Sequence, residues 1–139
     1  AFTELSKNFL LSNGAVGKIS ISAIGVKNYY LWEGETTASM KKGLGHFTGT
    51  SVWNGNVAVC GHNRGAKYVI GSIKDLDVGD KITYTTSMGT RTYLVETVTK
   101  ISSSDWSYLS STADNRITLF TCVAGDPSQR WCVQAVQAS

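Results

Sequence analysis

A thiol capable of covalent chemistry and a fixed positive charge lie close together in sequence near the C-terminal end of this 139-residue chain. Cys122 closes the stretch Thr-Leu-Phe-Thr-Cys, and Arg130 follows eight residues later, after the only proline. A thiol with a fixed positive charge nearby has the features of a nucleophile, because the charge favours the reactive thiolate. The pair therefore predicts covalent catalysis through a cysteine.

A hairpin would hold these two side chains in place. Residues 118–122 and 130–137 are predicted to pair as antiparallel strands across the loop 123–129, without a bulge. The expected pairs are Cys122 with Arg130, Phe120 with Cys132 and Thr118 with Gln134 on one side, and Ile117 with Ala135, Leu119 with Val133 and Thr121 with Trp131 on the other. Because side chains alternate along a strand, the apolar second side is expected to face the core. Cys122 and Arg130 would then lie outside the core, on a face that also carries polar groups.

The chain has two histidines that could serve as a proton carrier beside the thiol. His62 follows the predicted strand 56–60, and alternation places it on the same face as Ala58 and Cys60, provided that Gly61 keeps the pattern. It would thus lie on the non-core side, as Cys122 does. His46 lies in a predicted loop over residues 43–47, where a surface or hydrogen-bonded structural role is expected.

The composition excludes several other classes of function. The net charge of +3 arises from 13 basic and 10 acidic residues that are scattered along the chain, which argues against nucleic-acid binding. There is no Cys-x-x-Cys pair, and the acidic group Asp75, Asp77 and Asp80 is expected to be a solvated turn, so no metal or other cofactor is predicted. Three cysteines cannot all pair. Cys60 and Cys132 could form a bridge, but two reduced, half-buried thiols are the favoured expectation.

The remaining pattern is that of a single all-β domain. Strands are predicted over residues 18–24, 28–33, 56–60, 67–71, 81–86, 90–101, 118–122 and 130–137, with a short helix over 36–42, a turn over 72–80 and a tight hairpin turn at Ser87-Met88-Gly89. In the first strand Ile19, Ile21 and Ala23 share the expected core face. Eight strands with short connections and little helix predict a closed or nearly closed barrel with one or two short helices.

Several of these segments resemble the sortase family. Residues 118–122 fit the sortase signature Thr-Leu-x-Thr-Cys, and Arg130 begins the next strand as in that family. Gly61-His62 after an apolar strand is similar to the segment that carries the sortase catalytic histidine. Gly45-His46-Phe47 with Gly49-Thr50-Ser51, and Val78-Gly79-Asp80, also resemble sortase segments. The resemblance spans about residues 17–137 and leaves residues 1–16 as an N-terminal extension.

The resemblance implies an eight-stranded sortase-type barrel and a cysteine transpeptidase of the Gram-positive cell surface. By this resemblance Cys122 would be the nucleophile that cleaves the Thr–Gly bond of a Leu-Pro-x-Thr-Gly-like sorting signal. His62 would transfer protons and Arg130 would hold the substrate backbone. The implied partners are the sorting-signal peptide and an amine nucleophile, either a peptidoglycan precursor or a protein. Membrane attachment would come only through an N-terminal anchor outside this chain.

Further details of the resemblance concern substrate binding and subclass. Thr121, Asn63 and Trp106 are predicted to contact the substrate, and Trp106, Tyr108 and Leu109 contribute either to the signal pocket or to packing. The chain shows no lid aspartate within residues 1–16, no long helix within residues 102–116 and no acidic pattern after His62. These features are most similar to a compact class D sortase.

Two other interpretations of the sequence stay open. A cysteine peptidase that only hydrolyses its substrate would employ the same thiol and imidazole, although papain-like enzymes place the cysteine before the histidine and at a helix N-terminus. A non-enzymatic barrel could instead bind glycans or peptides through its aromatic side chains. The candidates for such a groove are Tyr29, Tyr30, Trp32, Trp53, Trp106 and Trp131, each of which would otherwise serve as core or loop cover.

Overall fold

The computed structural model describes residues 10–12, 14–34, 44–47, 50–61, 73–102, 104–105, 107–110, 112–123 and 126–138. For residues 122–123 and 126–127 the description covers the backbone and not the side chains. The predicted helix 36–42, the predicted strand 67–71 and the predicted site residues His62, Asn63 and Trp106 lie outside the described residues.

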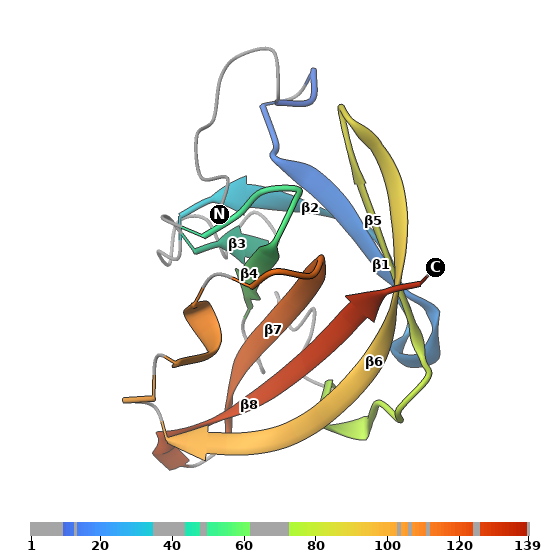
Figure 1. The fold of residues 1–139 in the computed structure, drawn as a ribbon. Coiled ribbons are helices and arrows are strands. Elements are labelled where there is room, and N and C mark those ends of the chain that lie inside the picture. The colour runs from blue at the N-terminus through green and yellow to red at the C-terminus, as the bar shows by residue number, and fades with distance from the viewer. Residues whose placement is uncertain are drawn as a thin grey trace.

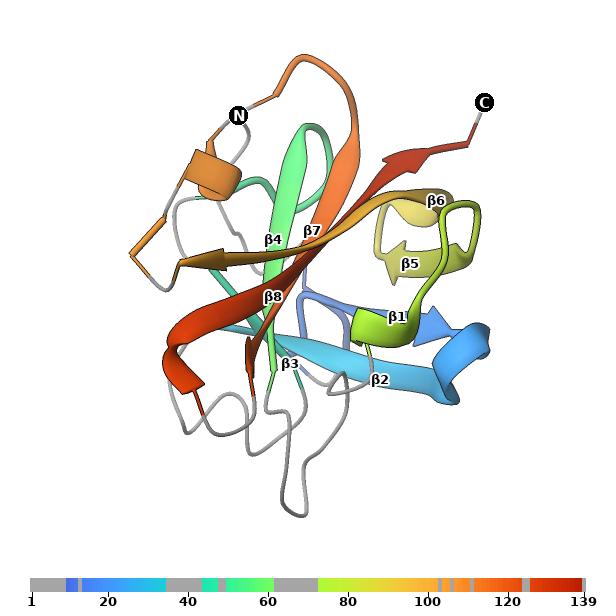
Figure 2. The ribbon, with the colours of Figure 1, turned by 90° about the horizontal axis from the view of Figure 1, so that it is seen from below.

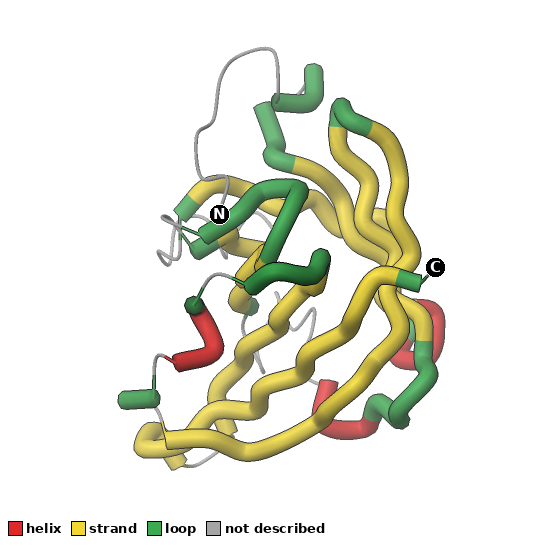
Figure 3. Tube along the Cα trace, in the orientation of Figure 1, coloured by secondary structure: helices red, strands yellow, loops and turns green. Residues whose placement is uncertain are grey.

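The described strands close into one barrel (Figures 1 and 3). They are β1 (Gly17–Ile21), β2 (Val26–Glu33), β3 (Leu44–His46), β4 (Asn56–Cys60), β5 (Lys81–Thr86), β6 (Gly89–Ser102), β7 (Arg116–Val123) and β8 (Asp126–Gln137). Their order around the barrel is β1-β2-β3-β4-β7-β8-β6-β5. Single turns of 3-10 helix occur at η1 (Ser22–Ile24), η2 (Ile73–Asp75) and η3 (Ser107–Leu109). None of the described helices is long and apolar enough to cross a membrane. The predicted eight-stranded all-β barrel is thus confirmed.

The barrel interior holds the main hydrophobic core. Alternate residues of β1 and β7 point inward, as the pattern of Ile19 and Ile21 and of Ile117 and Leu119 predicts. Tyr84 and the inward aliphatic side chains are fully buried. Each such side chain stabilises the fold by about 1.5–3 kcal/mol relative to an exposed one. The core therefore fixes which face of every strand points outward.

Two predicted elements differ from the structure. The first strand ends at Ile21 rather than Ile24, because the chain turns into η1 and then through Gly25 in the left-handed conformation with φ of 72°. Ala23 is consequently exposed instead of facing the core. Residues 44–46 form β3 where a loop was predicted. This strand has only three residues, and its pairing with β2 and β4 depends on contacts between distant segments.

The β7–β8 hairpin has the predicted register. Ile117 pairs with Ala135, Leu119 with Val133, Phe120 with Cys132 and Cys122 with Arg130. The strand β8, however, begins at Asp126, so the loop is shorter than the predicted 123–129. The register shifts only after Cys122, where Val123 pairs with Asp126. The irregularity therefore lies just beyond the thiol position and leaves the Cys122–Arg130 pair intact.

The outer face of this sheet carries the predicted polar groups, among them Thr118 and Gln134, and beside them a second apolar cluster that the sequence did not predict. Phe47, Ala58, Cys60, Ile101, Phe120 and Cys132 are buried together there, with Tyr108 and Leu109 packed against them. The ring of Phe47 meets that of Phe120 edge to face at 5.3 Å. The connection between β6 and β7 thus covers part of the outer face, which strand alternation alone does not reveal.

Candidate active site

Cys122 and Arg130 face each other across the β7–β8 hairpin. They are register partners, one near the end of β7 and one in β8. Arg130 also pairs with Ile101 of β6 and is half-buried. Antiparallel partners have Cα atoms about 4.5–5.5 Å apart, which places a guanidinium-bearing residue directly beside the thiol-bearing one. The predicted proximity of these two residues is therefore confirmed at the level of the backbone.

The chain that leads toward His62 is tied to β7 just before Cys122. Strand β4 runs parallel to β7, and Cys60 pairs with Phe120 (Figure 2). The next residue, Gly61, donates its N–H to the carbonyl of Phe120 at 3.2 Å and accepts a hydrogen bond from the Thr121 hydroxyl at 3.0 Å. His62 itself lies outside the described residues. Its immediate neighbour is nevertheless fixed beside the residues that precede Cys122.

Thr121, one of the predicted substrate-binding residues, is buried with 2 % exposure. Its hydroxyl donates to Gly61 within the protein. A buried hydroxyl that has found a partner contributes about 0.5–1.5 kcal/mol and holds its neighbours in place. The structure thus gives Thr121 a clear structural contact, while Asn63 and Trp106 lie outside the description.

Cys132 and Cys60 are structural thiols of the outer apolar cluster. They are 0 % and 5 % exposed, so both are more deeply buried than the predicted half-buried state. No disulfide joins them. Strand β7 runs between them, with Phe120 paired to each, and two strand spacings amount to about 9.5 Å. That separation exceeds the ~7 Å reach of a disulfide.

Burial also makes Cys132 a poor nucleophile. Loss of solvent around the thiol, with a smaller contribution from the negative charge of Asp105, raises the pKa of Cys132 to about 12. A thiol with this pKa carries almost no thiolate at neutral pH. Of the two neighbouring cysteines on the hairpin, Cys132 is therefore suited to packing.

His46 has the hydrogen-bonded structural role that the sequence predicts. Its imidazole is 1 % exposed. Nδ1 lies 2.7 Å from Glu33 Oε1, and Nε2 lies 2.7 Å from the carbonyl oxygen of Ser51. Because a carbonyl can only accept, Nε2 is the donor to Ser51, and Nδ1 faces the carboxylate of Glu33. His46 thereby joins β2, β3 and the following loop.

Asn56 is a buried polar residue that the sequence analysis did not single out. It is 2 % exposed at the start of β4 and connects that strand to the η3 connection, since its Nδ2 donates to the carbonyl oxygens of Tyr108 and Ser110. The sequence carries no clear signal for this role. Asn56 shares the parity of Ala58 and Cys60, which strand alternation places outside the core, where a solvent-exposed asparagine would be ordinary.

The aromatic side chains do not form one platform among the described residues. Trp53 is buried against Tyr84 with ring centroids 6.0 Å apart, and the Arg91 guanidinium lies 4.0 Å from the centroid of the Trp53 ring. Tyr29 and Tyr30 are 42 % and 39 % exposed on β2. These positions agree with a packing or surface role for each ring.

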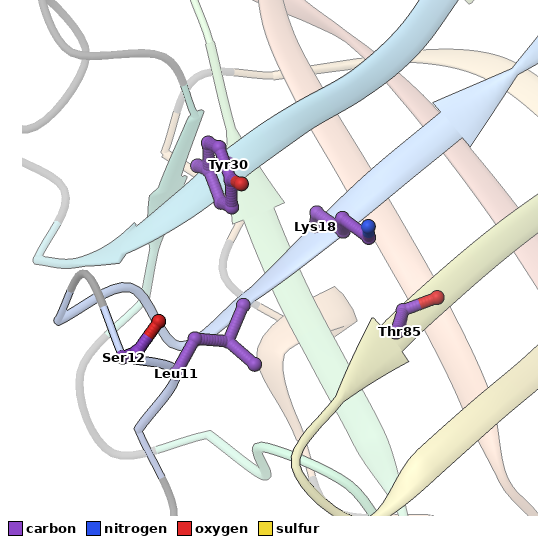
Figure 4. A pocket seen from close by; sticks show the side chains of 5 residues that line it. All are labelled: Leu11, Ser12, Lys18, Tyr30 and Thr85. Atoms are coloured by element: carbon purple, nitrogen blue, oxygen red, sulfur yellow. The ribbon is translucent and has the colours of Figure 1, made fainter.

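A pocket of about 270 Å³ lies on the outer surface of β1, β2 and β5 (Figure 4). It is lined by Leu11, Ser12, Lys18, Tyr30 and Thr85. None of these residues belongs to the β7–β8 hairpin. Within the described part of the chain there is also no group of three potential metal ligands. In the acidic turn before β5, the carboxylate of Asp80 accepts the N–H of Asp77.

Comparison with known proteins identifies the family. Residues 19–138 match the family model described as Sortase domain. Over 112 residues the chain is 30 % identical to Sortase A of Listeria monocytogenes, covering 79 % of this chain and 50 % of that protein. The chain thus spans about half the length of this curated relative.

Solved sortase structures share the fold. Pilus-related Sortase C of Group B Streptococcus superposes with a TM-score of 0.87 at 23 % identity, covering 100 % of this chain and 74 % of that one. Sortase A from Corynebacterium diphtheriae superposes with a TM-score of 0.82 at 26 % identity, covering 90 % and 61 %. Together with the match over residues 19–138, these similarities show that the chain belongs to the sortase family.

Proposed function

We propose that this chain is a cysteine transpeptidase that cleaves the Thr–Gly bond of a Leu-Pro-x-Thr-Gly-like sorting signal and transfers the acyl group to an amine. The observation that carries the proposal is the register pairing of Cys122 with Arg130 at the end of the hairpin. The hydrogen bond from Thr121 to Gly61 supports it, because this bond fixes the residue before His62 beside the residue before Cys122.

In the first half-reaction the Cys122 thiolate attacks the carbonyl carbon of the signal threonine. The tetrahedral intermediate carries negative charge on oxygen, which the Arg130 guanidinium and backbone N–H groups would stabilise. The C–N bond to glycine then breaks, and His62 gives its proton to the leaving amine. The products are a thioester on Cys122 and a free peptide that begins with glycine.

In the second half-reaction an amine attacks the thioester carbonyl. His62 accepts the proton of that amine, the C–S bond breaks, and Cys122 leaves as a thiolate. Water can replace the amine and yields hydrolysis. Both half-reactions thus use the same three side chains, with the imidazole acting first as an acid and then as a base.

In this scheme the positive charge of Arg130 favours ionisation of the Cys122 thiol. At their reference pKa values, about 3 % of a cysteine is thiolate at pH 7 and about a quarter of a histidine is protonated. Independent titration would leave fewer than about 1 % of molecules with both active forms. A guanidinium next to the thiol favours the thiolate and enlarges this fraction. The pairing of Arg130 with Cys122 therefore supports a role in ionisation as well as in substrate binding.

The proposal extends to the setting of the reaction. The amine would belong to a peptidoglycan precursor or to another protein, and the reaction would anchor surface proteins to the wall of a Gram-positive cell. Substrate contacts at Thr121, Asn63 and Trp106, a class D-like subclass and attachment through a preceding anchor are part of this proposal.

Incubation with a library of Leu-Pro-x-Thr-Gly peptides, with and without an amine such as triglycine, tests the function. We expect mass spectrometry to detect an acyl-enzyme on Cys122 and a product joined to the amine. A hydrolysed peptide as the sole product, even at high amine concentration, would favour a cysteine peptidase. Failure of every peptide to form an adduct that the Cys122→Ala variant lacks would contradict the proposal.

A further inference from the structure

We infer that Asn56 is a positioning residue that holds the connection between β6 and β7 against the outer face of the hairpin and thereby sets how tightly the peptide substrate binds. This inference rests on the proposed function, because it concerns the same face that carries Cys122 and Arg130. It adds a residue that touches neither the thiol nor the guanidinium.

Asn56 uses both ends of its amide to join two parts of the molecule. Its Oδ1 accepts a hydrogen bond of 2.6 Å from the Thr118 hydroxyl on β7. Its Nδ2 donates to the carbonyl oxygens of Tyr108 at 2.8 Å and Ser110 at 3.1 Å. Only a carboxamide offers an acceptor to a hydroxyl and two donors to two carbonyls at this position. The residue is thus matched to both the strand and the connection.

The strand side of this contact is rigid. Thr118 is fully buried, and its oxygen also accepts a hydrogen bond from Gln134 of β8 at 3.1 Å. Gln134 in turn accepts from Arg116 at 3.1 Å. Strands β4, β7 and β8 are therefore joined by side chains as well as by their backbones. The Oδ1 atom of Asn56 is therefore held by the barrel strands, and its Nδ2 group binds the η3 connection.

The connection lies on the face that leads to the thiol. Tyr108 and Leu109 pack against the outer apolar cluster, whose members include Phe120. Phe120 shares the outward parity of Cys122, two residues further along β7. Figure 1 shows η3 beside β4 and β7, outside the barrel. A peptide that reaches Cys122 along this face must therefore lie against the η3 connection.

The two hydrogen bonds from Asn56 and the packing of Tyr108 and Leu109 hold the η3 connection against the face. If the bonds from Asn56 are lost, the connection can separate from the strands while the barrel and the hairpin register remain. The substrate would then meet a less ordered connection, and ordering that connection would cost binding free energy. The chemistry at Cys122 would proceed unchanged once the peptide is bound. The expected signature is a rise in KM with a constant kcat.

The substitution Asn56→Asp keeps the bond to β7 and removes the bonds to the η3 connection. An aspartate still accepts from Thr118, but it has no donor for the carbonyls of Tyr108 and Ser110. We expect hydrogen exchange at the amides of residues 107–110 to become at least about tenfold faster, and KM for the peptide to rise about tenfold. We expect kcat and the rate of Cys122 alkylation by iodoacetamide to stay within about twofold. Asn56→Ser, which buries no charge and cannot span both partners, tests the same point if the aspartate variant fails to fold.

Thr86→Val provides a matched control for loss of a buried side-chain hydrogen bond. The Thr86 hydroxyl accepts the N–H of Met88 in the β5–β6 turn, and the residue is 5 % exposed. We expect this variant to lose stability without any change in KM. Faster exchange of residues 107–110 in the Asn56 variants with an unchanged KM would overturn the inference. A parallel fall in kcat and in the alkylation rate would also overturn it, because Asn56 would then support the hairpin itself.

The exchange measurement separates this inference from the proposed function. If the wild-type protein forms no acyl-enzyme with any peptide, the proposed function fails and the link to substrate binding fails with it. Unchanged exchange of residues 107–110 in the Asn56 variants would overturn the inference even when the wild-type protein is fully active.

Discussion

The Thr121 hydroxyl donates a hydrogen bond of 3.0 Å to the carbonyl oxygen of Gly61, although the two residues are 60 positions apart in the chain. Thr121 directly precedes Cys122, and Gly61 directly precedes His62. The bond therefore fixes the spacing of two backbone segments whose next residues are the proposed nucleophile and the proposed acid. It also gives a physical reason for a threonine at the fourth position of the Thr-Leu-x-Thr-Cys signature.

Thr121→Val should slow acylation while the barrel stays folded. Valine has the shape of threonine but cannot donate to Gly61, so a buried carbonyl loses its partner at a cost of about 1–3 kcal/mol. We expect kcat/KM for a sorting-signal peptide to fall by about tenfold or more, because small displacements of catalytic groups are costly. Thr121→Ser keeps the hydroxyl and should retain most of the activity. Equal rates for the valine and serine variants would show that the bond has no part in catalysis.

Thiol labelling should distinguish Cys122 from the two buried cysteines. In the native protein at pH 7.5 we expect iodoacetamide to modify one thiol per chain, because Cys60 and Cys132 are buried and the pKa of Cys132 is raised to about 12. In urea all three cysteines should react. Peptide mapping by mass spectrometry identifies the modified residue. Labelling of Cys122 no faster than in the unfolded protein would weaken the assignment of Cys122 as an activated nucleophile.

Arg130→Ala should reduce acyl-enzyme formation by about 10²–10³-fold, because it removes a cation from the side of the developing oxyanion. Arg130→Lys should recover only part of this loss, since an ammonium group lacks the two-pronged geometry of the guanidinium. Stopped-flow measurement with a fluorogenic signal peptide gives the rate. Lys81→Ala, which removes one exposed cation from β5, is the control for net charge. Full activity of Arg130→Ala would exclude Arg130 from the site.

His46→Ala should destabilise the protein by about 3 kcal/mol, because it leaves the Ser51 carbonyl without its partner and opens a cavity. Glu33→Gln keeps an acceptor for Nδ1, and its side chain is 35 % exposed, so we expect a loss below about 1 kcal/mol. Urea unfolding followed by tryptophan fluorescence gives both values. Similar losses in the two variants would mean that the ion pair, rather than burial of the imidazole, stabilises this region.

Cys132 should make the protein less stable in alkali. Its pKa is raised to about 12 in the folded state, whereas an unfolded cysteine has a pKa of about 8.5. Between these values the unfolded chain releases a proton that the folded chain retains, so stability falls as the pH rises, by up to about 1.4 kcal/mol per pH unit. The contribution is fully present below about pH 8.5.

The contribution of Cys132 can be isolated by measuring how the free energy of unfolding changes between pH 8 and pH 10. The wild type is compared with Cys132→Ala. We expect a shallower slope in the variant, whatever its stability at pH 7. Burial also raises the pKa of Tyr84 and Tyr93, which adds a fall in the same direction at higher pH in both proteins. Identical slopes below pH 10 would contradict the raised pKa of Cys132.

The hairpin register was predictable because one of its faces is uniformly apolar. Ile117, Leu119, Val133 and Ala135 must all point inward, and a shift by one residue would expose every one of them. The same pattern fixed the bounds of β4 and β5. Strand β3 carried no such pattern, because its Leu-Gly-His sequence is short and its pairing is with strands far along the chain.

The outer apolar cluster and the role of Asn56 could not be predicted from the alternation of apolar residues. Alternation states which residues point away from the core, but it does not state what covers them. Here Tyr108 and Leu109 of the η3 connection pack against the cluster that contains Phe120 and Cys132, so part of the outward face is buried. Asn56 acquires its role from the carbonyls of that connection, which are 52 and 54 residues away. Contacts of this kind depend on the path of the whole chain.

The parallel pairing of β4 with β7 also bears on how the protein acquires its activity. Two parallel strands that are 60 residues apart can meet only after a long segment has been arranged between them, and closing such loops is slow. The thiol hairpin is local and can form early, but the partner strand that leads to His62 arrives late. An incompletely folded chain would therefore carry the proposed nucleophile without the proposed proton carrier, and catalytic competence would coincide with closure of the barrel.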